Sequence, residues 1–155
     1  MKLDAVDVAL LTALQADATQ TVQQLADRVK LSTNACWRRI KHYEQQGLIT
    51  GRVALLDPAK AGLGVTVFVT VRTSEHSAEW LEGFARAVRG LAEVVEFYRM
   101  AGDIDYLMKL RVADIGHYDR VYKQLISQVR LVDVSAAFAM EEIKHTTAIP
   151  LSSEG

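Results

Sequence analysis

Apolar side chains recur at helical spacing near the start of the chain. Over residues 22–29 they fall at i, i+3, i+4 and i+7, which predicts a helix with one stripe turned toward a small core. Thr21 and Gln24 have the spacing of a capping box, so this helix is expected to begin directly after Thr21. Residues 4–16 carry a similar stripe, with Asp4 as the N-cap, and predict a helix that packs against the other.

A second periodic segment follows after a short break. Ser32 or Thr33 can cap it, and Gly47 is a natural stop at its end. Its inward-facing side chains fall in one narrow arc: Cys36, Ile40 and Tyr43. Two helices separated by a tight turn predict a helix-turn-helix.

The opposite arc of this helix carries cations, amides and one aromatic ring. Such side chains contact phosphates and base edges in the DNA major groove, so the arc is typical of a recognition helix. An ordinary solvated helix has the same residue types, and Trp37, at the edge of the arc, can belong to either surface. The predicted DNA-binding residues are Ser32, Thr33, Asn34, Trp37, Arg38, Arg39, Lys41 and His42, and Gln45 shares their arc.

The distribution of charge favours the DNA-binding interpretation. From Arg28 to Arg52 there are six basic residues and one acidic residue, a net charge of +5. The whole chain has 18 basic and 19 acidic residues, so the remainder carries a net charge of −6. A basic segment joined to an acidic body is typical of a phosphate-binding module attached to a domain with another task.

The chain changes character after the predicted helix-turn-helix. Residues 48–56 are apolar and β-branched around Thr50-Gly51-Arg52, which predicts a short wing or strand, and Asp57-Pro58 then predicts a turn. The expected division is a helix-turn-helix domain over residues 1–50, a wing and hinge over 51–64, and a second domain over 65–155.

Strands and helices alternate in the second domain. Valines at every second position over residues 65–71 predict a strand, and further strands are predicted over 94–100, 105–112 and 132–140. Helices are predicted over 77–88 and after Asp114. The order βαββαβ predicts a ferredoxin-like α+β fold, with four antiparallel strands and both helices on one face.

The other face of this sheet is expected to be bare. Phe68 opposes the valines of its strand, and Leu107 opposes Tyr106 and Met108, so apolar groups would remain in water on a monomer. An exposed apolar patch usually marks an association surface. We therefore expect a symmetric homodimer formed through the second domain, and a dimer of helix-turn-helix modules would favour an imperfectly palindromic operator.

Composition narrows the class of protein further. Half of the 155 residues are hydrophobic, no apolar run approaches membrane length, and no signal-peptide pattern is present, so we expect a cytoplasmic protein without membrane association. Cys36, the one cysteine, is expected to be a packing residue. The four histidines lack metal-ligand spacing, and there is no P-loop, GxSxG or dinucleotide motif. No metal, cofactor or catalytic residue is therefore predicted, and an enzyme is the less favoured class.

Several stretches of the sequence resemble the Lrp/AsnC family of bacterial and archaeal regulators, also called feast/famine proteins. They are LDAVDVALLTALQADA, EQQGLITG, ALLDPAKAGLG, MAGDIDYLMKLRV and EEIKHTTAIPL. A finer resemblance, to the branch that responds to cysteine and switches on its detoxification, rests on Asn34–Arg39, Ser77–Trp80, Phe97–Gly102 and Phe138–Lys144. Ala35 departs from that branch, which commonly has proline before the cysteine, and a first-turn proline mainly sets helix entry.

The resemblance implies a DNA-binding transcriptional regulator whose dimers assemble into tetramers or octamers and bind an amino acid between dimers. The expected effector-binding residues are Gly102, Asp103, Ile104, Asp105, Tyr106, Met108, Thr146 and Thr147. Asp103 and Asp105 would accept hydrogen bonds from the ligand ammonium, and Gly102 would let the ligand approach backbone amides. From its residues alone, an ordinary turn is the favoured interpretation of this Gly-Asp-Ile-Asp hairpin.

Two alternatives remain open. Cysteine is the first candidate for the effector, and leucine-type or asparagine-type regulators are the others. The chain could instead be a ligand-binding module that regulates a partner by protein contact, although the basic N-terminal helix disfavours this.

Overall fold

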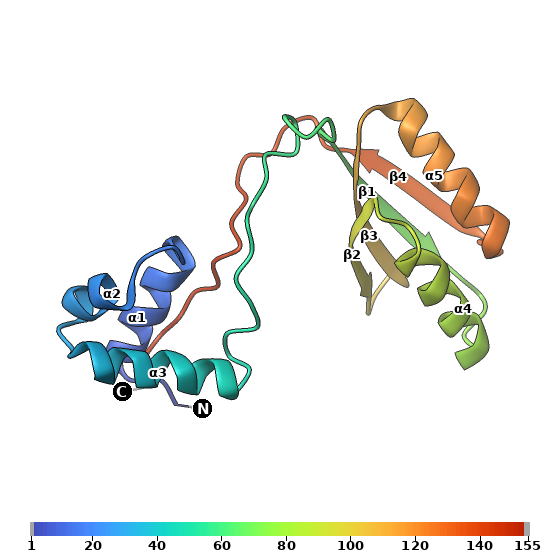
Figure 1. The fold of residues 1–155 in the computed structure, drawn as a ribbon. Coiled ribbons are helices and arrows are strands. Elements are labelled where there is room, and N and C mark those ends of the chain that lie inside the picture. The colour runs from blue at the N-terminus through green and yellow to red at the C-terminus, as the bar shows by residue number, and fades with distance from the viewer. Residues whose placement is uncertain (1, 154–155) are drawn as a thin grey trace. The chain divides into compact units, whose positions relative to one another are not determined.

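The computed structural model describes residues 2–153 (Figure 1). The chain folds into two compact units. The first unit comprises the residues up to Ala54 together with those that follow Ile143, and the second unit comprises Leu55–Ile143. Within the described residues, no helix has the length and apolar character needed to cross a membrane.

Three helices form most of the first unit: α1 (Ala5–Ala16), α2 (Val22–Val29) and α3 (Thr33–Gln45). The predicted caps are confirmed at all three. Asp4 caps α1, and the capping box of Thr21 and Gln24 opens α2 with both reciprocal hydrogen bonds in place. Ser32, rather than Thr33, caps α3 through its hydroxyl.

The inward arc of α3 lies in the core of the first unit, as predicted. Cys36, Ile40 and Tyr43 are 5% exposed or less and pack with Leu10 and Leu25. Burial raises the pKa of the Cys36 thiol, so it remains protonated and acts as a packing side chain. Burying side chains of this size contributes about 1.5–3 kcal/mol each. The core therefore holds α3 along one face only.

The segment after α3 differs from its prediction. Gly47 adopts a left-handed conformation with a φ of 70°, which ends the helix as expected. Residues 48–56, however, contain no strand, so the predicted wing is absent from the described chain. Val53 is 82% exposed, and no described residue forms backbone hydrogen bonds with residues 50–56. A strand needs a partner strand to form a ladder, and residues 2–54 and 144–153 of the first unit contain none.

The second unit has the predicted βαββαβ order. Its elements are β1 (Val65–Arg72), α4 (Ala78–Arg89), β2 (Val94–Arg99), β3 (Tyr106–Val112), α5 (Ile115–Gln128) and β4 (Asp133–Phe138). The four strands form an antiparallel sheet in the order β2-β3-β1-β4, and α4 and α5 cover one face of it (Figure 1). This is the expected ferredoxin-like arrangement.

Aromatic rings fill the core between α4 and the sheet. Phe84 is fully buried, and its ring lies 5.1–5.2 Å from the rings of Trp80, Phe97 and Tyr106. Aromatic pairs at this separation add about 0.5–1.5 kcal/mol beyond the burial of area. The cluster anchors the ends of β2 and β3 and therefore the hairpin that joins them.

The opposite face of the sheet is bare, as predicted. Phe68 of β1 is 39% exposed and Tyr98 of β2 is 49% exposed. Lys109 of β3 lies beside Phe68 in the register and pairs with Glu96 at 3.0 Å. The second unit therefore presents apolar and charged side chains together on this face.

The end of the chain does not continue the second domain, so the expected boundary of 65–155 is revised. The final strand ends at Phe138, and the residues from Lys144 onward belong to the first unit. Ile149 exchanges two hydrogen bonds with the amide of Gln15 on α1, at 2.8 and 3.2 Å, and Leu151 packs against the core of the helices. The first unit is therefore built from two separate stretches of sequence.

Candidate functional site

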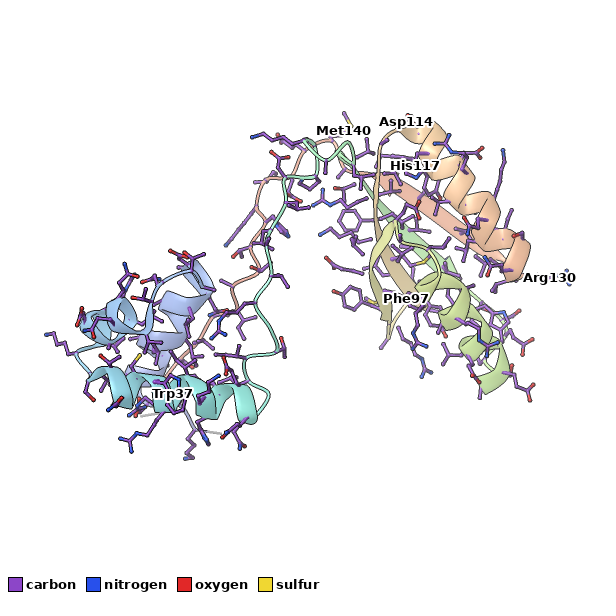
Figure 2. All side chains as sticks on the ribbon, in the orientation of Figure 1. Trp37, Phe97, Asp114, His117, Arg130 and Met140 are labelled. Atoms are coloured by element: carbon purple, nitrogen blue, oxygen red, sulfur yellow. The ribbon has the colours of Figure 1, made fainter. Side chains whose placement is uncertain are left out.

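The outer arc of α3 is exposed over its whole length. Asn34, Trp37 and the polar residues that follow them on this side are all exposed, and Trp37, labelled in Figure 2, is 51% exposed. Ser32 and Thr33 lie at the N-terminus of α3, where Thr33 donates a hydrogen bond to Gln23 of α2. Because the opposite arc is buried, α3 presents a polar surface with one aromatic ring on a fixed support.

Two neighbouring arginines on α3 have different surroundings. Arg38 is exposed, and no described residue forms an ion pair or hydrogen bond with its guanidinium. Arg39 instead donates to Asp4, the N-cap of α1, at 2.9 Å and to Asp7 in the first turn of α1. Of these two predicted DNA contacts, Arg38 therefore has a guanidinium that no described residue engages, whereas one nitrogen of Arg39 is held by two carboxylates of the first unit.

The other cations near α3 share one carboxylate. Lys41 and Arg52 each pair with Glu44 at 2.8 Å. These two cations hold the pKa of Glu44 below its usual value by hydrogen bonding. Both pairs are exposed, so they contribute little to stability, and they keep two cations and one anion together beside the outer arc. His42 is exposed on the same arc.

Asp7 is the centre of a polar network that sequence reasoning missed. Its carboxylate accepts hydrogen bonds from the Tyr43 hydroxyl, the Arg39 side chain and the Asp4 backbone. Burial raises the pKa of Asp7, but these bonds outweigh that effect and hold it below the usual value. Burial and the nearby carboxylate together raise the pKa of Tyr43. The available signal was the three-residue spacing of Asp4 and Asp7 at the start of α1.

The hairpin between β2 and β3 has a defined backbone. The Met100 N–H donates to the Asp105 carbonyl at 2.8 Å, and the Asp105 carboxylate accepts from the Thr73 N–H at 2.8 Å. Gly102 has a φ of 125°, a conformation that favours glycine, and a Cβ there would meet no atom within 4 Å. The backbone at Gly102 is thus open to an approaching group.

The predicted effector residues do not form one open pocket in the described chain. Asp103 is exposed and its carboxylate has no described partner, and Ile104 and Asp105 are half-buried beside it. Tyr106 and Met108 are 4% and 1% exposed because their side chains face α4 and α5.

Thr146 and Thr147 lie beyond the final strand, which ends at Phe138. They are exposed and belong to the first unit, and the Thr146 hydroxyl accepts from the Ala148 N–H. Among residues 2–153, no three His, Cys, Asp or Glu side chains are grouped as metal ligands.

Both sites lie within regions that match known families. A model of the AsnC-type helix-turn-helix domain matches residues 3–44, and a model of the Lrp/AsnC ligand binding domain matches residues 66–149. The chain belongs to the Lrp/AsnC family. The first match contains nearly all of α1 to α3, and the second contains the sheet, both of its helices and the hairpin of Gly102.

Lrp/AsnC relatives match the chain over nearly its whole length. It is 57% identical over 150 residues to the glutamate uptake regulatory protein of Zymomonas mobilis, covering 97% of this chain and 92% of that protein. It is 49% identical over 150 residues to the DNA-binding transcriptional activator DecR of Escherichia coli, covering 96% and 99%. A transcriptional regulator of Neisseria meningitidis, crystallised with L-Met, aligns with a TM-score of 0.90 at 33% identity, covering 96% and 97%. This Lrp/AsnC chain is therefore a transcriptional regulator with a helix-turn-helix domain and a ligand-binding domain.

Proposed function

We propose that this regulator binds double-stranded DNA by inserting the outer arc of α3 into the major groove. The observation that carries the proposal is the division of α3 into a buried apolar arc and an exposed polar arc. Arg38 offers an unpaired guanidinium, and Lys41 adds positive charge one turn further along the helix. Guanidinium and ammonium groups on such a surface suit guanine edges and phosphates.

Replacing both Arg38 and Lys41 by alanine is expected to abolish most DNA binding. Each lost phosphate contact lowers the slope of log affinity against log salt by about 0.9, because fewer counterions are released. Gel-shift titrations of wild type and variant at several salt concentrations measure both effects. The control removes two exposed cations from the second unit, Arg86→Ala with Lys123→Ala, and should leave binding unchanged. Equal affinity of the Arg38/Lys41 variant and wild type would contradict the proposed surface.

We propose that the regulator forms a homodimer through the bare face of the sheet. Phe68 and Tyr98 on that face are exposed in one chain, and pairing with a second copy would bury them. The dimer would present two α3 helices to half-sites about one helical turn, or a multiple of it, apart. The operator is then an imperfect palindrome, and dimers associate further into tetramers or octamers.

We also propose that an amino acid binds at the hairpin and modulates the DNA complex. Asp103 provides an unpaired carboxylate for the ligand ammonium, and the open backbone at Gly102 allows a ligand carboxylate to approach backbone amides. Asp105 is already oriented by the Thr73 N–H and would close the site from the other side. Tyr106 and Met108 support this backbone from the core.

Cysteine remains the first candidate for the effector because of the stretches that resemble the cysteine-responsive branch. The names of the relatives add glutamate and methionine to leucine and asparagine as competitors. A ligand shifts an assembly only by its different affinity for two states, so a site near a dimer contact would act through oligomer geometry.

Asp103→Asn is expected to lower the affinity for the preferred amino acid by about 10- to 150-fold, because one charge-assisted hydrogen bond is lost. Isothermal titration calorimetry with each of the five amino acids identifies the ligand and measures its affinity for the variant. Glu82→Gln on the exposed side of α4 removes a comparable charge and serves as the control. Unchanged affinity of Asp103→Asn would assign the hairpin the role of an ordinary turn.

No catalytic role forms part of this proposal. The two regions that carry it serve binding: a helix surface for DNA and a hairpin for a small ligand. Acting on chromosomal DNA, the regulator would work in the cytoplasm.

A further inference from the structure

Arg39 faces the supporting helix and not the exposed arc. Its Nη1 lies 2.9 Å from Asp4 and also donates to Asp7, and its side chain is 34% exposed. Tyr43, one turn further along α3, donates its hydroxyl to the same Asp7 oxygen. Two successive turns of α3 are therefore tied to the first turn of α1 by polar contacts, in addition to the apolar core.

This network sets how α3 can rotate on its support. The hydrophobic effect is non-directional, so apolar packing alone specifies the rotation of a helix less sharply than a directional polar contact does. Hydrogen bonds to a carboxylate are directional and short, so the contacts of Arg39 and Tyr43 with Asp7 fix the rotation of α3 about its axis. The rotation of α3 determines where Arg38 points.

The surroundings of Arg38 differ from those of Arg39. Its guanidinium has no described carboxylate partner, whereas Lys41 and Arg52 share Glu44. A paired cation must give up or share its carboxylate before it meets a base edge. Arg38 can offer two parallel N–H groups to a guanine at no such cost.

We propose that Arg39 is a positioning residue that orients the recognition helix through Asp7, and that Arg38 is the cation of α3 that distinguishes base sequences. This inference rests on the proposed DNA binding by α3. It removes Arg39 from the DNA contacts expected from the sequence and assigns it a role within the first unit.

The test uses the full-length protein and two duplexes of equal length. One is selected from a random-sequence pool by wild-type protein, and the other is unrelated. Arg38→Ala should lower the ratio of the two affinities by about 5- to 150-fold. Arg39→Ala should also lower this ratio, because Arg38 is then no longer held in one orientation, and it should leave the salt slope at its wild-type value, because no phosphate contact is lost.

The conservative variants and a double-mutant cycle separate positioning from contact. Arg39→Lys keeps a cation for Asp7 and should recover binding to within about threefold of wild type, which also covers a failure of Arg39→Ala to fold. Arg38→Lys should not recover the full ratio, because lysine lacks the planar pair of donors. Adding Asp7→Asn to Arg39→Ala should weaken DNA binding less than the two separate effects predict, since both changes break one network.

Three outcomes would overturn the inference. A salt slope reduced by about 0.9 in Arg39→Ala would show a phosphate contact by Arg39. A loss of sequence discrimination in Arg39→Lys would show base contact by Arg39, and an unchanged affinity ratio in Arg38→Ala would remove Arg38 as the discriminating cation. Failure of the proposed function would give a different result from failure of this inference, because the wild-type protein would then bind neither duplex with steep salt dependence.

Discussion

Phe68→Asp is expected to leave the regulator monomeric and to weaken its binding to a palindromic operator by about 10²- to 10⁴-fold, the advantage that linking two modules provides. Phe68 lies near the middle of the bare face, opposite Lys109 of β3 and Ala137 of β4 in the register. In a dimer, a carboxylate at this position would be taken out of water into an apolar contact, which costs free energy. In the monomer it would remain in water, since Phe68 is already 39% exposed, so the fold should survive.

Sedimentation velocity measures the loss of the dimer, and gel shifts with one and two half-sites measure the loss of linkage. Binding to a duplex with a single half-site should change little, because α3 lies in the other unit. Gln124→Asp on the exposed side of α5 introduces the same charge away from the bare face and is the matched control. A Phe68→Asp protein that still sediments as a dimer would place the interface elsewhere.

Acid is expected to destabilise the first unit below about pH 4, and Asp7 is expected to account for a large part of the loss. An unfolded aspartate has a pKa of about 3.9, and the pKa of Asp7 in the folded chain is lower. The stabilisation is therefore complete above the unfolded pKa and disappears as pH falls through the folded pKa. At neutral pH, Asp7→Ala should cost about 2–4 kcal/mol, because it leaves the buried Tyr43 hydroxyl without its acceptor.

Amide NMR spectra recorded from about pH 7 down to about pH 2 follow the two units separately. The signals of α1 to α3 in wild type should lose intensity at low pH, and Asp7→Asn should show a shallower loss from a lower starting stability. Asp27→Asn, which changes an exposed carboxylate on α2, is the control and should behave as wild type. Equal acid sensitivity of Asp7→Asn and wild type would show that other carboxylates dominate.

Local sequence signals predicted the elements of this fold because each depends on residues close together in the chain. Thr21 and Gln24 specify the start of α2 by their own hydrogen bonds, and alternating valines specify β1 by their period. The face of α3 was equally predictable, since the phase of Cys36 and Ile40 determines which side is buried. These features need no knowledge of distant partners.

Long-range contacts account for what the sequence did not reveal. Arg39 has the composition of a DNA contact, and only its distance to Asp7, 32 residues earlier, shows that it turns inward. Tyr106 and Met108 alternate as strand residues, but which face of β3 meets α4 and α5 depends on the whole sheet. The prediction of a wing over residues 48–56 was wrong for the same reason, because a strand requires a partner that local sequence does not specify.

The packing of Ile149 and Leu151 with α1 has a consequence for how such regulators can be recombined. The ligand-binding domain is an insertion in the first unit, and the end of the chain can contact the helical core only after the insertion has been synthesised. A chimera that exchanges the domain by a single fusion after Ala54 would lose the Gln15 bonds and the apolar contact of Leu151. A functional exchange of effector domains therefore needs two junctions, one near each chain crossing, so that the same pair of segments still completes the helical core.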